Sequence, residues 1–364
     1  RALAAFRVAL GLLLLADLLR RSRNLIAFYS DSGVLPREAL FSDYSHVYSL
    51  HTISGEVWVQ TLLFLIAGVF AVAMIVGYRT RLATIISWLL LLSLHTRNPM
   101  VLNGGDVLLR LLVFWGIFLP LGERWSLDAR RLDRDRTSVT SVATLAILVQ
   151  MVLLYATNAG HKSSGEQWLN GEAIIYVFSL DQFTIFLGNV LADYFLLLRA
   201  LTYLWIALLL LSPLLILLTG RLRTILVSLF VGMHVGMLLT MRLDLFPLVV
   251  IAGLILFYPP EVWEKASEWA SRSGLMNTAQ RWASQFNSRR PSGHLSNFPT
   301  LLGFHRSRAL VSSLVPFVFL VLVVFSNAQA VGLAEVPDRA EPVLEITETD
   351  QHWQLFAPDP MDTD

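Results

Sequence analysis

Apolar residues in this chain form long blocks separated by short polar segments. The clearest blocks are residues 2–19, 57–77, 142–157, 200–219 and 309–331. A helix needs about 20 predominantly apolar residues to cross the hydrocarbon core of a bilayer, and these blocks reach or approach that length. The strands of a membrane barrel would alternate apolar and polar residues, and these blocks do not. The pattern therefore predicts an all-α fold, a polytopic bundle of transmembrane helices.

The spans and their orientation follow from the same pattern. We predict about nine spans, at 2–19, 57–77, 82–97, 106–121, 138–158, 197–219, 224–241, 244–258 and 309–331. Lysine and arginine accumulate in cytoplasmic loops. Most basic residues here fall in alternate loops, which places the N-terminus in the cytoplasm and the C-terminal tail outside. Arg20, Arg21 and Arg23 do not fit, because they follow the first span on the predicted outer side.

Two polar stretches interrupt or follow the spans. Residues 262–308 carry tryptophans and charges spaced as in an amphipathic helix on the membrane surface, and a solvated cytoplasmic connector explains them equally well. Residues 332–364 are acidic and contain proline, which predicts an extramembrane tail. We therefore predict a membrane domain at 1–331, with 262–308 as a connector within it, and a tail at 332–364. The chain begins with Arg1 rather than methionine, so we expect residues to precede it.

Composition supports the membrane assignment and narrows the chemistry. Of 364 residues, 55% are hydrophobic and 15% are charged, against about 25% charged in soluble domains. The net charge is +1 and no basic patch is present, which argues against a nucleic-acid partner. Cysteine is absent, which excludes disulfides and thiolate chemistry. The histidines lack the spacing of metal ligands, so we expect no metal site.

Lys162 is the most informative polar residue, because it is one of only two lysines and follows directly on the fifth predicted span. Asn158, His161 and Trp168 lie close to it in the sequence, in what we interpret as a loop at the membrane edge. Partial removal from water disfavours the ammonium form of a lysine and makes a neutral amine available as a base near pH 7. The alternative is an ordinary lysine whose amine reaches the interface from a helix end.

Other candidates lie within or beside the predicted spans. Asn103 and Gly104 can bring backbone close to a ligand at the outer side, or can simply begin a helix. His234 lies in the middle of a span and can line a pocket or form a buried hydrogen bond. Arg7 and Asp17 in the first span are about 15 Å apart along a helix, so we expect them to pair with other helices.

Several segments, in order along the chain, resemble the HTTM family, the membrane domain shared by vitamin K-dependent γ-carboxylase and its prokaryotic relatives. Each segment is weakly specific alone, and their common order is more specific. The segments are Phe28-Tyr29-Ser30-Asp31, Gly77-Tyr78-Arg79, Arg97-Asn98-Pro99, Asn103-Gly104-Gly105-Asp106, Trp125-Ser126-Leu127-Asp128, Tyr155 to Trp168, and Gln351 to Pro360.

The resemblance implies an enzyme of the prokaryotic cell membrane. Lys162 matches the lysine that deprotonates reduced vitamin K, so the implied activity is oxygen-dependent epoxidation of a quinol such as menaquinol, coupled to carboxylation of glutamate by CO2. The implied partners are the lipid bilayer, the quinol and a glutamate-containing peptide or protein. Asn158, His161, Trp168, Asn103, Gly104 and His234 would shape the pocket. The animal enzyme has a large lumenal region and a disulfide; here about thirty residues follow the last predicted span, and cysteine is absent.

A second hypothesis is a membrane protein without catalysis. Such a protein would bind a quinone, a lipid or a partner protein through the same residues, as a sensor, immunity or maturation factor. The tail motif from Trp353 to Pro360 would then fold over the outer side as a lid or plug. A transporter is not favoured, because the chain shows no inverted repeat.

Overall fold

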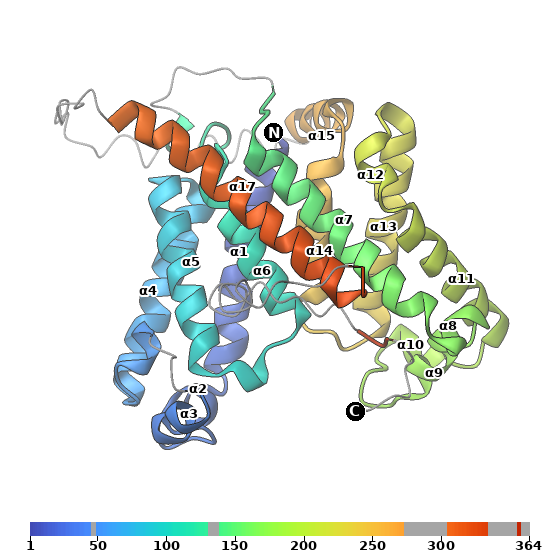
Figure 1. Cartoon of the computed structure of the whole chain (residues 1–364), viewed down its shortest axis with the longest axis horizontal. Helices are drawn as coiled ribbons and strands as arrows, with labels where there is room; N and C mark the ends of the chain where they lie inside the picture. Colours follow the sequence, from blue (N-terminus) through green and yellow to red (C-terminus); the bar gives the residue numbers. More distant parts are fainter. Residues whose placement is uncertain (45–48, 130–137, 273–303, 334–354, 358–364) are drawn as a thin grey trace.

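The computed structural model describes residues 1–44, 49–129, 138–272, 304–333 and 355–357. The fold is all-α, as predicted, and the helices pack side by side into a bundle (Figure 1). The one β-type contact in the described ranges is an isolated antiparallel bridge between Thr184 and Met241. Most of the predicted connector and tail, at 273–303, 334–354 and 358–364, lies outside the described residues.

The helices follow one another with short connections. Their bounds are α1 Ala2–Ser22, α2 Leu25–Tyr29, α3 Arg37–Asp43, η1 Leu50–Thr52, α4 Val57–Val76, α5 Thr80–Arg97, η2 Pro99–Val101, α6 Gly104–Phe118, α7 Val142–Ser163, α8 Glu166–Leu169, α9 Ala173–Ser179, α10 Leu187–Leu191, α11 Phe195–Leu211, α12 Leu214–Leu217, α13 Gly220–Thr240, α14 Phe246–Leu254, η4 Ile255–Phe257, α15 Pro260–Arg272 and α17 Phe304–Ala330.

Each predicted span overlaps a helix, but fewer helices can cross a membrane on length and composition. Among the residues that the structure describes, five helices qualify, namely α1, α4, α7, α13 and the 312–330 part of α17. A sixth is obtained if Phe246–Phe257 and Pro260–Trp269, which meet at a bend of 107°, form one broken span. The count of nine is therefore not confirmed. The helix α6 has 15 residues and would extend only about 22 Å, less than the hydrocarbon thickness of about 30 Å.

The helices that qualify expose apolar side chains along one face. On α4, Leu62, Leu65, Val69 and Val72 recur at helical spacing and are 47–66% exposed. Such a continuous apolar stripe is unfavourable in water and is expected where lipid covers the surface. The exposed stripe and the five long helices identify a multi-pass membrane protein.

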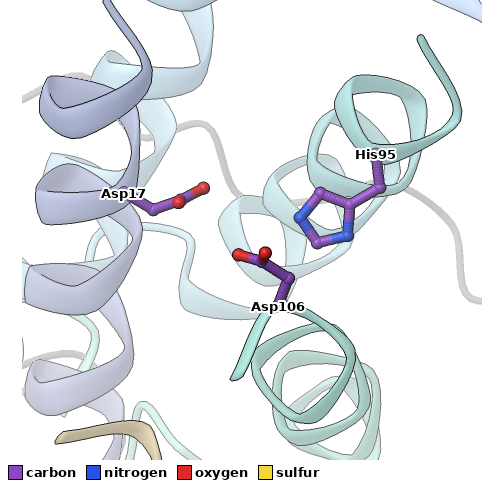
Figure 2. A group of neighbouring side chains, drawn as sticks. All are labelled: Asp17, His95 and Asp106. Carbon is purple, nitrogen blue, oxygen red and sulfur yellow. The ribbon is translucent and has the colours of Figure 1, made fainter. Parts of the chain in front are cut away.

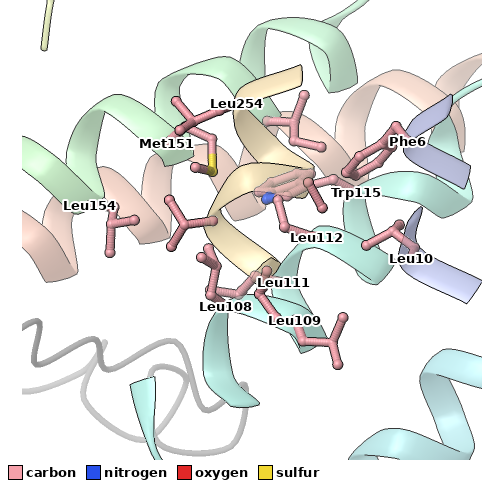
Figure 3. Close-up of a cluster of buried hydrophobic side chains, with 14 of the residues drawn as sticks. Phe6, Leu10, Leu108, Leu109, Leu111, Leu112, Trp115, Met151, Leu154 and Leu254 are labelled. Atoms are coloured by element: carbon pink, nitrogen blue, oxygen red, sulfur yellow. The ribbon is translucent and has the colours of Figure 1, made fainter. Parts of the chain in front are cut away.

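The interior is built around α6, which packs against α1, α5, α7, α14 and α17. Almost every residue of α6 from Gly105 to Gly116 is buried. A helix that is apolar around its circumference is found in a protein core or in lipid, and here the surrounding helices enclose α6. Figure 3 shows this cluster, in which α6 contributes Leu108, Leu109, Leu111, Leu112 and Trp115 to contacts with Phe6, Leu10, Met151, Leu154 and Leu254.

Arg7 is fully buried in α1, and its hydrogen-bond partners among the described residues are main-chain carbonyls rather than a carboxylate. Gly77 ends α4 in the left-handed conformation (φ 69°), and a Cβ at this position would lie 2.2 Å from the Cβ of Ser126. The glycine therefore lets the segment after α6 approach closely enough for Arg7 to reach it. The guanidinium donates to the carbonyls of Ile75, Leu121, Arg124 and Trp125.

A buried charge cluster closes the other end of α1. Arg21 Nε donates to both carboxylate oxygens of Asp17 at 2.9 and 2.8 Å, and its Nη2 donates to Asp106 at 2.6 Å. Arg20 bridges Asp17, Asp106 and Asp244 at 2.9, 3.3 and 2.8 Å. Asp17 thus pairs with Arg20 and Arg21 of its own helix, not with another helix as expected, and it does not pair with Arg7.

This cluster also explains the arginines that did not fit the predicted orientation. Arg20 and Arg21 are neutralised by three carboxylates, so they do not act as free positive charges beside the first span. The helices α1 and α7 run in the same direction, which puts Lys162 at the end of the bundle opposite Arg1 (Figure 1). Which end faces the cytoplasm stays a prediction.

The amphipathic helix α15 covers the described part of the predicted connector. It begins at Pro260 and turns away from α14 and η4 by 107° instead of continuing their direction. Trp263 packs edge-on against Trp125, with ring centroids 6.5 Å apart. The turned direction favours the interpretation that this part of the connector lies along the membrane surface.

Replacing Arg21 tests the charge cluster. Arg21→Ala would leave Asp17 and Asp106 buried with Arg20 as their remaining ion-pair partner in the described part of the chain, and breaking a buried ion pair costs about 3–5 kcal/mol. We expect a loss of that size in the free energy of unfolding, measured by denaturant titration in mixed micelles. Arg23→Ala, which alters an exposed arginine two residues away, should change it by less than about 0.5 kcal/mol. Equal effects of the two variants would contradict this role for the cluster.

His51 in η1 makes the stability depend on pH. Its side chain is 1% exposed, and Nδ1 lies 2.7 Å from the Ser93 hydroxyl. Burial and the nearby Arg97 guanidinium lower the pKa of His51 to about 4. An unfolded histidine titrates near 6.5. Because the folded pKa is the lower one, the stabilisation is fully present above about pH 6.5 and is lost as the pH falls toward 4.

We expect the free energy of unfolding to fall by about 2 kcal/mol between pH 7 and pH 5 on account of His51. The measurement is thermal or denaturant unfolding of the protein in lipid nanodiscs at both pH values. His51→Gln keeps a hydrogen-bonding side chain but cannot titrate, so it should reduce the pH dependence by this amount. An unchanged pH dependence in the variant would show that other groups cause it.

Candidate functional site

A cavity of about 580 Å³ lies among α7, α9, α11 and α13, and the beginnings of α6 and α14 also reach it. This volume falls within the range of small-molecule pockets, about 300–1,000 Å³. Most of its wall is apolar, with Val177, Phe178 and Trp205 among the lining side chains. The cavity is therefore suited to a flat apolar molecule.

The polar lining residues come from helix ends on one side of the bundle. Lys162 lies in the last turn of α7, Arg242 and Asp244 follow α13, and Asn103 precedes α6. These helix ends gather at the same end of the bundle in Figure 1. The cavity thus has an apolar body inside the bundle and a polar opening at its end.

The helix α7 brings Tyr155, Asn158 and Lys162 to the cavity wall. It begins at Ser141, whose hydroxyl accepts from the Thr144 amide at 3.1 Å, and continues to Ser163. The fifth span was predicted to end at residue 158, with Lys162 in a loop; this was wrong, because the helix continues for one more turn. The spacing of the three residues, i, i+3 and i+7, places them on one helical face.

Lys162 is 3% exposed and its amine has defined partners. Nζ donates to the carbonyl of Leu355 at 2.5 Å and, more weakly, to that of Phe356 at 3.4 Å. It also lies 4.0 Å from the centre of the Trp168 ring, a cation–π geometry. In the described ranges no carboxylate lies within ion-pair distance of the amine. Lys162 therefore differs from Arg20 and Arg21, whose charges are matched by aspartates.

Aromatic rings surround His234 beside the cavity. His234 is 1% exposed, and its Nδ1 lies 2.8 Å from the carbonyl of Phe230. The ring centroids of Trp205 and Tyr155 are 5.6 and 6.0 Å from its own. His234 thus both lines the cavity and forms the buried hydrogen bond that the sequence left as the alternative.

Tyr155 is a site residue that the sequence analysis missed. It is 2% exposed, lines the cavity, and its hydroxyl has no hydrogen-bond partner among the residues that the structure describes. Extending the helical period from Lys162 back through Asn158 would have found it. Trp205, Arg242 and Phe183 were also missed, and they come from distant segments with no local sequence signal.

Asn103 and Gly104 lie where α6 begins at the cavity opening. The Asn103 side chain accepts from the amides of Gly105 and Asp106 at 2.8 and 3.3 Å, and Asp106 accepts from the Asn103 amide at 2.9 Å. This reciprocal cap fixes the start of the helix. Asn103 therefore caps α6, as one interpretation held, and also lines the cavity; its approach to a ligand stays a prediction.

Of the residues proposed from the sequence, Lys162, Asn158, Trp168, Asn103, Gly104 and His234 share this one cavity. His161 does not line it, although it precedes Lys162 directly. Successive residues of a helix project about 100° apart, so His161 faces away when Lys162 faces the cavity. Its assignment to the pocket stays a prediction.

Asp17, His95 and Asp106 form a second polar group, whose possible ligand atoms lie within 4.8 Å of one another. Figure 2 shows the two carboxylates and the imidazole facing a common space. Arg20 and Arg21 already bind both carboxylates, and two guanidinium groups beside them disfavour a cation. We therefore assign this group to the charge cluster.

These features define a multi-pass helical membrane protein with an apolar cavity beside a buried lysine. The chain belongs to the HTTM family, as the sequence motifs indicated: the family model of the HTTM domain matches residues 1–263.

Two proteins of Bacillus subtilis (strain 168) are similar to the chain. Sporulation-delaying protein SdpB is 25% identical over 186 residues, which cover 48% of this chain and 54% of SdpB. Uncharacterized protein YitO is 25% identical over 112 residues, which cover 29% of this chain and 35% of YitO. Each alignment thus spans only part of the relative. No solved structure matches the chain.

Replacing Tyr155 with phenylalanine tests whether its hydroxyl is unused by the fold. Removing a buried hydroxyl that has no partner is nearly neutral or stabilising. We expect Tyr155→Phe to keep or raise the melting temperature, measured by fluorescence-detected size-exclusion chromatography after heating.

The control is Thr157→Val on the same helix, because the Thr157 hydroxyl donates to Asn327 at 2.8 Å. That variant should lose about 1–3 kcal/mol. A drop in melting temperature for Tyr155→Phe as large as that for Thr157→Val would show that the tyrosine hydroxyl has a structural partner.

Proposed function

We propose that the chain is a membrane enzyme similar to vitamin K-dependent γ-carboxylase, with reduced vitamin K or a menaquinol in the cavity and Lys162 as the base. The observation that carries the proposal is the position of Lys162: a buried amine without a carboxylate partner in the described ranges, in the wall of an apolar cavity. Membership in the HTTM family supports it.

The residues present fit a quinol. Its flat ring system would pack between apolar and aromatic side chains such as Val177, Phe178 and Trp205. The Tyr155 hydroxyl, which has no partner among described residues, supplies a hydrogen-bonding group for a ring oxygen. Asn158 lines the same wall, between Tyr155 and Lys162. The lipid around the bundle is the solvent from which such an apolar molecule would enter.

The chemistry of the bound quinol is oxidation by O2 to an epoxide, coupled to carboxylation of glutamate by CO2. Lys162 contributes a neutral amine that accepts the proton of a quinol hydroxyl. Such an amine keeps two N–H donors for the carbonyls of Leu355 and Phe356, so its lone pair is free to receive the proton. The apolar wall keeps bulk water from the reacting groups.

Replacing Lys162 tests the proposed base. A positioned base contributes about 10²–10⁴-fold to a rate, so Lys162→Ala should lower epoxide formation by that factor. The assay uses the protein in nanodiscs with menahydroquinone, O2 and labelled bicarbonate, and reads both the epoxide and label in a glutamate peptide. Lys265→Ala removes the only other lysine of the chain and should retain the rate. Equal turnover by wild type and Lys162→Ala would reject the proposal.

A second candidate is a protein that binds a quinone, a lipid or a partner without catalysis. Two observations favour it: the Lys162 amine is hydrogen-bonded to the chain's own tail, and the relative SdpB is named as a sporulation-delaying protein. The same preparation distinguishes the two. Quenching of Trp168 and Trp205 fluorescence by menaquinone, without epoxide formation by the wild type, would support the second candidate.

A further inference from the structure

The described part of the tail, Leu355–Ala357, lies against the cavity opening; we name it the tail clasp. Leu355 and Phe356 line the cavity together with Lys162, although they follow it by 193 and 194 residues in the sequence. Trp168 Nε1 donates to the Phe356 carbonyl at 2.8 Å. Two side-chain donors from the α7–α8 region thus hold two successive carbonyls of the tail.

A ring contact also holds the tail clasp. The rings of Phe356 and Phe183 meet edge to face, with centroids 5.2 Å apart and planes at 87°. Phe356 has a positive φ of 53°, a conformation that is unfavourable for a residue with a side chain and persists only when surrounding contacts hold it. The carbonyl contacts and the ring contact together provide that restraint.

The contacts fix the amine as well as the tail. A lysine side chain has four rotatable bonds and loses much rotamer freedom when it is held in one position. Lys162 is held by the Leu355 carbonyl at 2.5 Å and the Trp168 ring at 4.0 Å. Without the tail clasp, the ring of Trp168 would be its one remaining contact among those described for the amine.

We propose that the tail clasp positions Lys162: its two carbonyls orient the amine at the cavity wall, and the Phe356 ring closes the opening over it. The significance of this positioning for catalysis rests on the proposed function, whereas the positioning itself does not. Because the segment is part of the same chain, its effective concentration at the site is high and a few contacts suffice to keep it bound.

The test measures how fast the Lys162 amine reacts with a small neutral acylating reagent, N-succinimidyl acetate, in nanodiscs. Lys265, the only other lysine, is exposed on α15 and serves as an internal reference. Peptide mass spectrometry gives the ratio of acetylation at the two residues. No quinol or O2 is present, so this result does not depend on the carboxylase assay.

We expect Phe356→Ala to raise the acetylation rate of Lys162 about tenfold, because the ring contact with Phe183 and the burial of the Phe356 ring are lost. Phe356→Tyr keeps the ring and should behave as wild type. Phe186→Ala removes a nearby ring that is 69% exposed and should also leave the rate unchanged. Unchanged melting temperatures would confirm that the variants are folded.

Three results would overturn the proposal. These are an unchanged Lys162 rate in Phe356→Ala, an equal rise at Lys265, or a rise in Phe356→Tyr as large as that in Phe356→Ala. In the quinol assay, positioning further predicts that Phe356→Ala lowers kcat more than it raises KM, because the amine acts on bound quinol.

Discussion

Polar groups that lie inside a membrane-embedded bundle must find their partners within the protein, and this constraint shapes each end of the structure. Arg7 donates hydrogen bonds to main-chain carbonyls, and Arg20 and Arg21 form ion pairs with aspartates. Lys162 donates to a carbonyl of the tail and lies over a tryptophan ring. The three kinds of partner differ in whether they carry a negative charge. In the described ranges neither Arg7 nor Lys162 has a carboxylate partner, and of these four groups only Lys162 lines the large cavity.

The partners of these groups come from segments far apart in sequence, so the same constraint holds the bundle together. Arg7 connects α1 to the end of α4 and to the segment after α6. Arg20 and Arg21 connect α1 to α6 and to Asp244 beside the cavity. Asp244 lines that cavity. The polar end of the proposed site is therefore supported by the charge cluster, although the two have different roles.

Hydrophobic patterning predicted the all-α class, the positions of the helices and the membrane environment, because burial in lipid requires long apolar helices. It counted nine spans, whereas five or six of the described helices are long and apolar enough to cross, because a short helix enclosed by others, such as α6, is as apolar as one that faces lipid. The predicted fifth span also ended at residue 158, before α7 ends at Ser163. The polar residues after position 158 were interpreted as a loop. They continue the helix, and a tail carbonyl and the Trp168 ring provide the contacts of the Lys162 amine.

Six of the seven proposed site residues share one cavity, since motifs near helix ends on one side of a bundle come together when the helices alternate in direction. His161 was grouped with them by proximity in sequence, which ignores the helical period. Phe183, Trp205 and Arg242 could not be predicted, because their place in the cavity depends on how α9, α11 and α13 pack. The role of Leu355 depends on a main-chain carbonyl, which no side-chain pattern reveals.

The helices α1 and α13 differ in how closely their surroundings fill the space beside them. The helix α1 is tied at both ends by guanidinium contacts. On α13, Gly232 and Gly236 line the cavity, and a Cβ built at either would meet no heavy atom of the described chain within 4 Å. These two glycines therefore add width to the cavity along α13, so a side chain at either position would narrow the space open to a ligand.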